Sequence, residues 1–127
     1  MRIIAFIGPS GTGKSHRAMF VARLTKAECI IDDGLLISGQ KIAAGTSGKR
    51  EQTKIACVKH ALFLDNKLAD EIKNAISKLN PESIMVIGTS EKMVMRILDN
   101  LGLPQISEKI YIVDVASKEE IQRAKYM

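Results

Sequence analysis

The sequence predicts an α/β fold, a three-layer sandwich with a mostly parallel sheet. Short, continuously apolar runs are typical of strands buried on both faces of a sheet, and here they alternate with segments of helical spacing. The 127 residues, 46% of them hydrophobic, suffice for a single core. We therefore expect one domain over residues 1–127.

The N-terminal elements follow this alternation. Arg2 to Ile7 is an apolar run that ends at a glycine, and a wide apolar face predicts a helix from Gly13 to about Lys26. Cys29 to Ile31 is the next buried strand, closed by the turn-forming pair Asp33-Gly34. A strand, a loop and a helix therefore follow one another at the start of the chain.

A basic segment rich in glycine interrupts the alternation. Residues 34–50 are expected to form a small hairpin and a lid-like insertion, because Ser38-Gly39-Gln40 separates two apolar runs and residues 44–50 are polar and basic. Helical spacing resumes from Glu51 to Leu64. The residues that define its apolar face are Ile55, Val58 and Leu62.

The C-terminal half contains two further helix and strand pairs. Helices are predicted at Leu68–Leu79 and Met93–Leu101, and strands at Ser83–Ile87 and Ile110–Val113. A capping box at residues 117–120 predicts a last helix. The chain stops barely three turns later, an abrupt ending that fits a piece of a longer protein.

The most specific motif is Gly8-Pro9-Ser10-Gly11-Thr12-Gly13-Lys14-Ser15, which matches G-x-x-x-x-G-K-[ST] at every specified position. In such a loop, glycines allow successive amide N–H groups to point at phosphate oxygens. The residues expected to cradle the phosphates are Gly8, Ser10, Gly11, Thr12, Gly13, Lys14 and Ser15. Lys14 would reach the β- and γ-phosphates, and the Ser15 hydroxyl would bind Mg²⁺. A glycine-rich turn that binds nothing is the weaker alternative.

This motif resembles the Walker A motif of the P-loop NTPase superfamily, and the order of elements is similar to that of small P-loop kinases and ATP-binding proteins, at reduced size. The resemblance implies that the chain binds a nucleoside triphosphate and Mg²⁺. Guanine specificity would be marked by an N-K-x-D element. Asn66-Lys67-Leu68-Ala69 has alanine where that element has aspartate, which favours ATP.

An acid at the end of an apolar strand is expected to complete the metal site. Asp32 and Asp33 follow the second strand, and Asp114 follows the last. The resemblance to small P-loop kinases favours Asp32 as a metal ligand and Asp33 as a catalytic residue, although a tight turn explains Asp33 equally well. Thr89 and Ser90, after the strand that ends without an acid, are either γ-phosphate sensors or a helix N-cap.

Basic residues near the proposed lid supply candidate catalytic cations. Arg50 is favoured over Lys49, because its planar guanidinium can pair with two phosphate oxygens at once. Lys54 and Lys59 fit a solvated helix face better. His16, beside the phosphate loop, is most simply a surface residue.

Composition restricts the partners and the compartment. The net charge of +5 suits anionic ligands, but only 4% of the residues are aromatic, which argues against a base-stacking surface for nucleic acid. Cys29 and Cys57 form no C-x-x-C pair, and no apolar run approaches the ~18 residues of a spanning helix. We therefore expect a cytoplasmic protein without a membrane segment; the oligomeric state stays open.

Three functions remain. The first is a P-loop enzyme that uses ATP and Mg²⁺, either an ATPase or a kinase that transfers the γ-phosphate to a small-molecule acceptor. The alternative is a regulatory module that binds nucleotide with little turnover. A weaker alternative, motivated by charge alone, is an ATPase that acts with nucleic acid.

Overall fold

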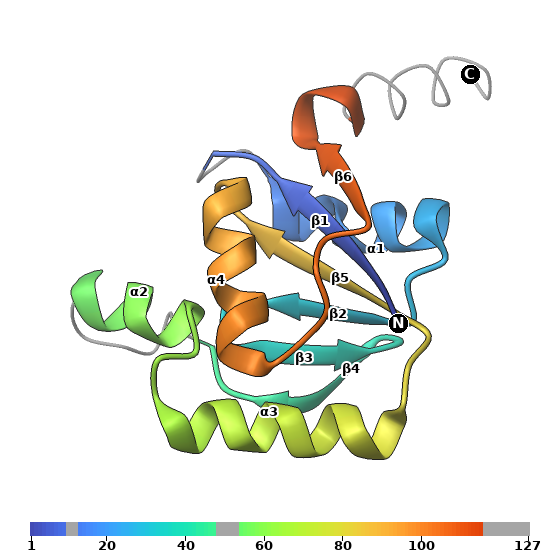
Figure 1. Ribbon diagram of the computed structural model, residues 1–127. Coiled ribbons are helices and arrows are strands. Elements are labelled where there is room, and N and C mark those ends of the chain that lie inside the picture. Colours follow the sequence, from blue (N-terminus) through green and yellow to red (C-terminus); the bar gives the residue numbers. More distant parts are fainter. Residues whose placement is uncertain (10–12, 48–53, 116–127) are drawn as a thin grey trace.

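The computed structural model describes residues 1–9, 13–47 and 54–115 (Figure 1). The elements are β1 (Arg2–Ile7), α1 (Lys14–Thr25), β2 (Cys29–Asp32), β3 (Leu35–Ser38), β4 (Lys41–Gly45), α2 (Lys54–Ala61), α3 (Asn66–Leu79), β5 (Ser83–Gly88), α4 (Glu91–Leu101) and β6 (Glu108–Tyr111). The predicted α/β class is confirmed. None of these helices combines the length and the hydrophobicity that crossing a membrane requires.

All six strands form one mixed sheet in the order β4-β3-β2-β5-β1-β6. β2, β5, β1 and β6 pair in parallel, whereas β3 is antiparallel to both of its neighbours, β2 and β4. The predicted hairpin implied the antiparallel pairing of β3 with β4, but the sequence did not place β3 beside β2. β3 and β4 form the hairpin expected within residues 34–50, and they extend one edge of the sheet.

β5 lies between β1 and β2, although it follows β2 by many residues in the chain. Met85 of β5 is in register with Ile4 on one side and with Ile30 on the other. Because parallel strands end at the same edge of a sheet, the residues after β1, β2 and β5 are brought together there. We call this the carboxyl edge.

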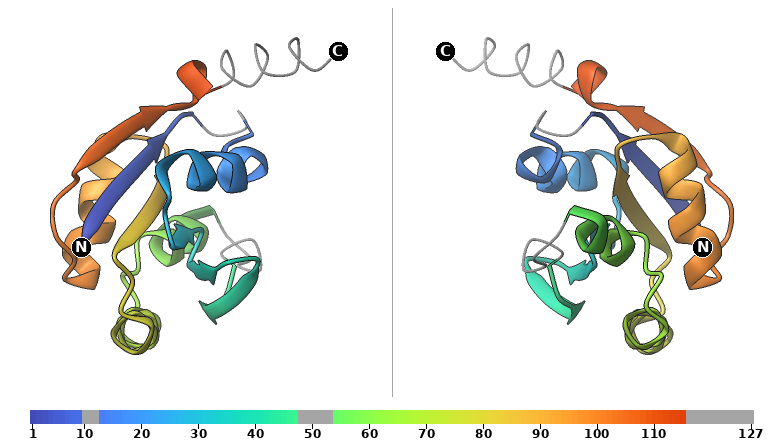
Figure 2. Two further views of the ribbon diagram at one scale, coloured as in Figure 1. Left: turned by 90° about the vertical axis from the view of Figure 1, so that its right-hand side faces the viewer. Right: turned by 90° about the vertical axis from the view of Figure 1, so that its left-hand side faces the viewer.

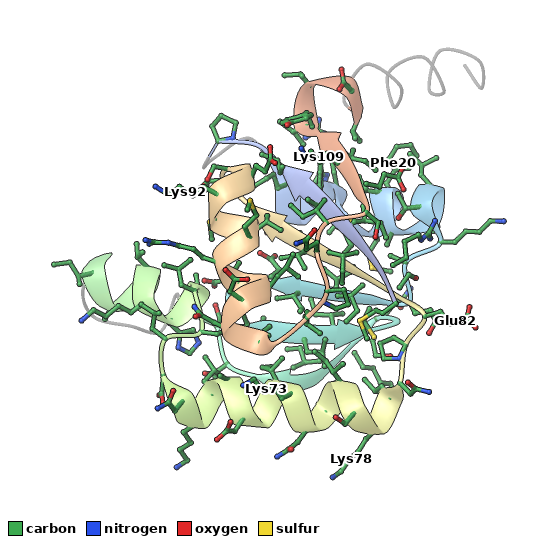
Figure 3. All side chains as sticks on the ribbon, viewed as in Figure 1. Phe20, Lys73, Lys78, Glu82, Lys92 and Lys109 are labelled. Atoms are coloured by element: carbon green, nitrogen blue, oxygen red, sulfur yellow. The ribbon has the colours of Figure 1, made fainter. Side chains whose placement is uncertain are left out.

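Helices cover the two faces of the sheet (Figure 2). Successive side chains of a strand point to opposite faces. Ile3, Ala5 and Ile7 of β1 therefore pack in a core cluster with α3 and α4, while Ile4 and Phe6 pack in a second cluster with α1. The outer side of α3 carries exposed charged side chains, including Lys73 and Lys78 (Figure 3).

Two predicted elements are wrong in detail. Of the apolar face predicted for residues 51–64, Leu62 is buried in the core, whereas Ile55 is 71% and Val58 is 52% exposed. Figure 1 shows α2 projecting beside the sheet. The last strand ends at Tyr111, and the chain becomes helical at residues 112–115, since Ile112 and Val115, three residues apart, both pack against α1.

Replacing Ile72 with alanine tests the packing of α3. The side chain of Ile72 is fully buried, whereas Leu79 on the same helix is 43% exposed. We expect Ile72→Ala to lower the free energy of unfolding by about 2–5 kcal/mol, because it leaves a cavity. Leu79→Ala is the control, with an expected loss of about 0.5 kcal/mol or less. Urea unfolding followed by circular dichroism measures both, and equal losses would contradict the packing described.

Candidate nucleotide-binding site

A cavity of about 370 Å³ opens at the carboxyl edge of the sheet. Its walls come from the start of α1, the β2–β3 turn, the end of α2 and the junction of β5 with α4. The lining residues with chemically useful side chains include Lys14, Ser15, Asp32, Asp33 and Thr89. We call it the edge cavity.

The phosphate loop begins and ends in the geometry that the motif requires. The amide of Gly8 donates a hydrogen bond to the carbonyl of Gly88 (3.2 Å), which ties the start of the loop to β5. Gly13 has φ 83°, a left-handed backbone conformation that glycine adopts without strain and that strains a residue with a Cβ. The predicted cradle residues Ser10, Gly11 and Thr12 lie outside the described residues.

The start of α1 is suited to an anion. Its N-cap residue, Gly13, has no side chain to cap the helix, and no acidic residue lies in the first turn. The first amide N–H groups of a helix have no intrahelical acceptor, and the helix dipole makes this end positive. A phosphate at this position would therefore meet both hydrogen-bond donors and a favourable potential.

Lys14 is a buried cation. Its side chain is 9% exposed, and its Nζ donates a hydrogen bond to the carbonyl of Pro9 (2.8 Å). Burial lowers the pKa of Lys14, and the charge of Asp32 partly opposes that shift. A neutral carbonyl compensates the buried charge incompletely, so a phosphate oxygen would be a better partner.

The two predicted metal ligands meet directly. The hydroxyl of Ser15 donates a hydrogen bond to Oδ2 of Asp32 (2.7 Å). Ser15 belongs to the helix after β1, and Asp32 ends β2, with β5 between the two strands. Mg²⁺ is usually held by one or two carboxylates together with phosphate oxygens and water, so this pair of oxygen donors fits that ion.

Asp33 and Gly34 form the tight turn between β2 and β3. Their φ angles of 51° and 82° are both left-handed, as in the two-residue turns that favour Asp-Gly. The turn interpretation of Asp33 is thus confirmed. Asp33 nevertheless lines the edge cavity, and the hydroxyl of Ser47 donates a 2.6 Å hydrogen bond to its Oδ2. Asp33 therefore forms the turn and also presents an acid to the cavity.

Close packing holds this turn in place. Nε2 of His60, on α2, donates a hydrogen bond to the carbonyl of Thr46, in the segment after β4. A Cβ on Gly34 would collide with the ring of His60 and lie 2.6 Å from the Thr46 carbonyl oxygen. The turn that carries Asp33 is therefore packed against two other segments.

The hydroxyl residues after β5 have different roles. Ser90 is the N-cap of α4, and its Oγ accepts a hydrogen bond from the amide of Met93 (3.1 Å). The amide and the hydroxyl of Thr89 both donate to Sδ of Met93, at 3.3 Å each. A thioether is a weak acceptor, so an anionic oxygen in the edge cavity would be a stronger partner for both donors.

The other predicted residues lie in three different places. His16 is exposed and lines the edge cavity. Asp114 is also exposed, but it lines a different cavity, beside β6 and the end of α1. The Asn66–Ala69 stretch is the first turn of α3, where Asp65 accepts a hydrogen bond from the amide of Lys67 (2.9 Å). Arg50 lies outside the described residues.

Sequence reasoning missed Ser47 and Met93. Ser47 lies in a segment where serine and glycine are expected in any loop. Met93 occupies a helical apolar position, which predicts core packing alone. Neither residue carries a spacing signal, because the role of each depends on how the folded chain places it beside Asp33 or Thr89.

Comparison with known proteins gives one match. A family model described as ABC transporter matches residues 1–124. No curated protein and no solved structure matches the chain.

Replacing Gly34 with alanine tests the packing behind the turn. Gly39 is the control, because it also has a positive φ (63°) but a Cβ added there would have nothing within 4 Å. We expect Gly34→Ala to lower the free energy of unfolding by about 1–3 kcal/mol more than Gly39→Ala, since only the former also forces overpacking. Urea unfolding of both variants measures the difference, and equal losses would show that His60 and Thr46 do not confine the turn.

Proposed function

The chain belongs to the ABC transporter family, and on this premise we propose that it is a Mg²⁺-dependent ATPase. The ABC transporter family is a family of P-loop NTPases, so the predicted superfamily is confirmed. The domains of this family bind and hydrolyse ATP. The observation that carries the residue assignment is the hydrogen bond between Ser15 and Asp32 inside the edge cavity, next to Lys14.

In the proposed complex, the phosphates lie against the start of α1 and Lys14. The ammonium group of Lys14 exchanges the carbonyl of Pro9 for phosphate oxygens. This exchange is favourable because a partly desolvated cation gains more from an anion than from a neutral acceptor. The ribose and the base are not assigned to residues.

Ser15 and Asp32 would hold Mg²⁺ between them, with phosphate oxygens and water as the remaining ligands. When bound, Mg²⁺ neutralises charge on the β- and γ-phosphates. The 2.7 Å hydrogen bond from Ser15 to Asp32 shows that the two oxygens lie close enough to bind one ion.

Asp33 is proposed to activate the attacking water. Its carboxylate accepts a hydrogen bond from water and takes the proton as the water oxygen bonds to the γ-phosphorus. The bond to the bridging oxygen breaks, and ADP leaves with that electron pair. Ser47 orients the carboxylate through Oδ2, and Thr89 offers its amide and hydroxyl to the γ-phosphate oxygens. Arg50 is proposed as a further cation on the transferring phosphate.

Replacing Asp33 tests this role. We expect Asp33→Asn to lower kcat by about 10²–10⁴-fold, the usual range for a lost general base. ATP affinity should change little, because the contacts at Lys14 and Ser15 remain. Asp114→Asn is the matched control, since Asp114 is an exposed acid outside the edge cavity. Phosphate release gives kcat, and calorimetry with and without Mg²⁺ gives the affinity.

The same assays separate the alternatives. Unchanged kcat in Asp33→Asn would exclude Asp33 as the base. Tight ATP binding by the wild type without turnover would favour the regulatory module, and acceleration by an added acceptor would favour the kinase. If neither ATP nor GTP binds to the folded protein, or if Lys14→Ala binds them equally well, the proposed site is wrong.

ATP binding should take up protons at alkaline pH. The pKa of Lys14 is lowered by burial in the free protein, and nearby phosphates favour its charged form, so binding raises that pKa. Between the free and the bound pKa, each binding event transfers a proton from buffer to Lys14. Calorimetry in two buffers of different ionisation enthalpy measures this uptake, which should vanish towards neutral pH. Uptake that is the same at all pH values would contradict the assignment to Lys14.

A further inference from the structure

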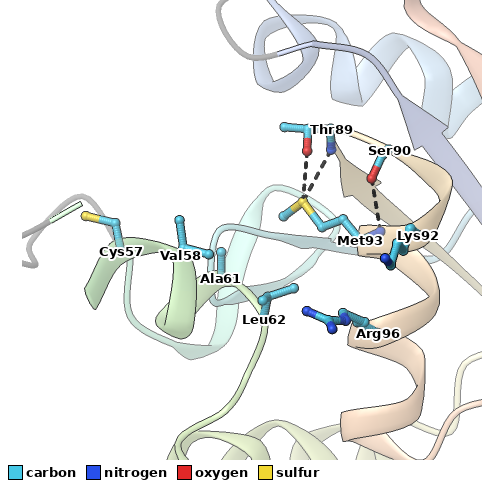
Figure 4. A pocket seen from close by; sticks show the side chains of 9 residues that line it. All are labelled: Cys57, Val58, Ala61, Leu62, Thr89, Ser90, Lys92, Met93 and Arg96. Carbon is cyan, nitrogen blue, oxygen red and sulfur yellow. Dashed lines mark hydrogen bonds between the residues drawn. The ribbon is translucent and has the colours of Figure 1, made fainter. Parts of the chain in front are cut away.

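A second cavity, of about 540 Å³, adjoins the edge cavity (Figure 4). It lies between α2 and the first turns of α4, and we call it the side cavity. Ala61, Thr89 and Met93 line both cavities, so the two share a wall. Of the residues given a role in the proposed ATPase reaction, only Thr89 lines the side cavity.

The walls of the side cavity combine apolar and cationic groups. Val58, Ala61, Leu62 and Met93 provide an apolar surface. Lys92 and Arg96 provide positive charge, and none of the nine lining residues is acidic. In Figure 4 the guanidinium group of Arg96 reaches from α4 across the gap towards Leu62. Ligand sites typically have this composition: a mostly apolar lining with a few polar groups that fix orientation.

We propose that the side cavity binds a small organic anion with an apolar body, such as a medium-chain carboxylate. The anionic group pairs with Arg96 and Lys92, and the apolar body packs on Val58 and Leu62. A neutral or cationic molecule of the same length would lose this complementarity.

The shared wall connects this site to the proposed ATP site. Thr89 directs two donors at the weak acceptor Met93 Sδ. A γ-phosphate oxygen that takes over these donors would release the Met93 thioether to pack against a ligand in the side cavity. ATP and the anion should therefore strengthen each other's binding by the same factor, about fivefold or more. This coupling rests on the proposed function, whereas binding of the anion does not.

Cys57 provides a native reporter for the side cavity. It lines the cavity and is half-buried. Cys29, the second cysteine, is 2% exposed, and burial raises the pKa of its thiol, so it serves as an unreactive internal control. The rate of Cys57 alkylation by iodoacetamide, followed by mass spectrometry, reports whether the cavity is filled.

Octanoate is the probe, with hexanoate and decanoate for chain length and octyltrimethylammonium for charge. We expect the carboxylates to slow alkylation of Cys57. The half-protecting concentration, at which a carboxylate halves the alkylation rate, should fall about fourfold for each methylene added to the chain. Octyltrimethylammonium should not protect. Calorimetry with octanoate provides a second measurement that does not depend on the thiol.

Two pairs of variants test the residues. Arg96→Gln should raise the half-protecting concentration of octanoate at least about tenfold, as expected for a lost charge-assisted hydrogen bond. Lys78→Gln on the outer side of α3 removes the same charge elsewhere and should have no effect (Figure 3). Val58→Trp should fill the cavity and abolish binding in calorimetry. Ile55→Trp is its control, because Ile55 lies on the same helix but does not line the cavity.

The outcomes distinguish this inference from the proposed function. Lys14→Ala should keep octanoate binding and lose the coupling to ATP. Octanoate binding in a wild type that binds no ATP would support the side cavity and overturn the ATPase. The inference is overturned if no carboxylate binds, if the cation binds equally well, or if Arg96→Gln has no effect. Protection of Cys57 that rises with protein concentration alone would instead show that a second copy covers the cavity, which also overturns it.

Discussion

The hydrogen bond from Ser15 to Asp32 depends on the arrangement of the whole sheet. Ser15 follows β1 and Asp32 ends β2, and these strands are not neighbours, because β5 lies between them and pairs with both. The carboxyl ends of the three parallel strands therefore meet at one edge. Met85, fully buried at the centre of β5, is paired with Ile4 of β1 and with Ile30 of β2. Because β5 pairs with both strands, it sets the distance between the end of β1 and the end of β2.

At the carboxyl edge, several hydrogen-bond donors have partners that compensate their burial only in part. Lys14 is buried against a carbonyl, which lowers its pKa, and the nearby Asp32 carboxylate partly offsets that cost. The start of α1 has no side-chain cap, and Thr89 donates to a thioether. Lys14 and Thr89 thus have partners in the free protein, but both partners are weaker than a phosphate oxygen. A phosphate would therefore offer both groups a stronger acceptor than the one each now has.

The sequence predicted the parts of this protein that depend on local pattern. The phosphate loop from Gly8 to Ser15 was predicted from its motif, and the acid at Asp32 from its position after an apolar run. Each signal lies within one short stretch of the sequence. The helical spacing of Ile55, Val58 and Leu62 was recognised, but spacing says nothing about which of these side chains is buried, and only Leu62 is. The antiparallel direction of β3, and the contact of Ser47 with Asp33, depend on how separate segments meet. The turn at Asp33 and Gly34 was predicted correctly from the two residue types. That Asp33 also lines the edge cavity follows only from the folded structure.

The position of β5 also bears on how the protein folds. Contacts between β5 and the strands β1 and β2 join residues that are far apart in the chain, and closing such loops costs conformational entropy before the contacts form. Topologies rich in these contacts fold slowly. The phosphate loop is a local segment near the N-terminus. Asp32, the proposed metal ligand that it meets, is aligned with it only once β5 has joined the sheet. Ligand affinity would therefore develop late in folding, together with the central strand, rather than with the local motif that identifies the site.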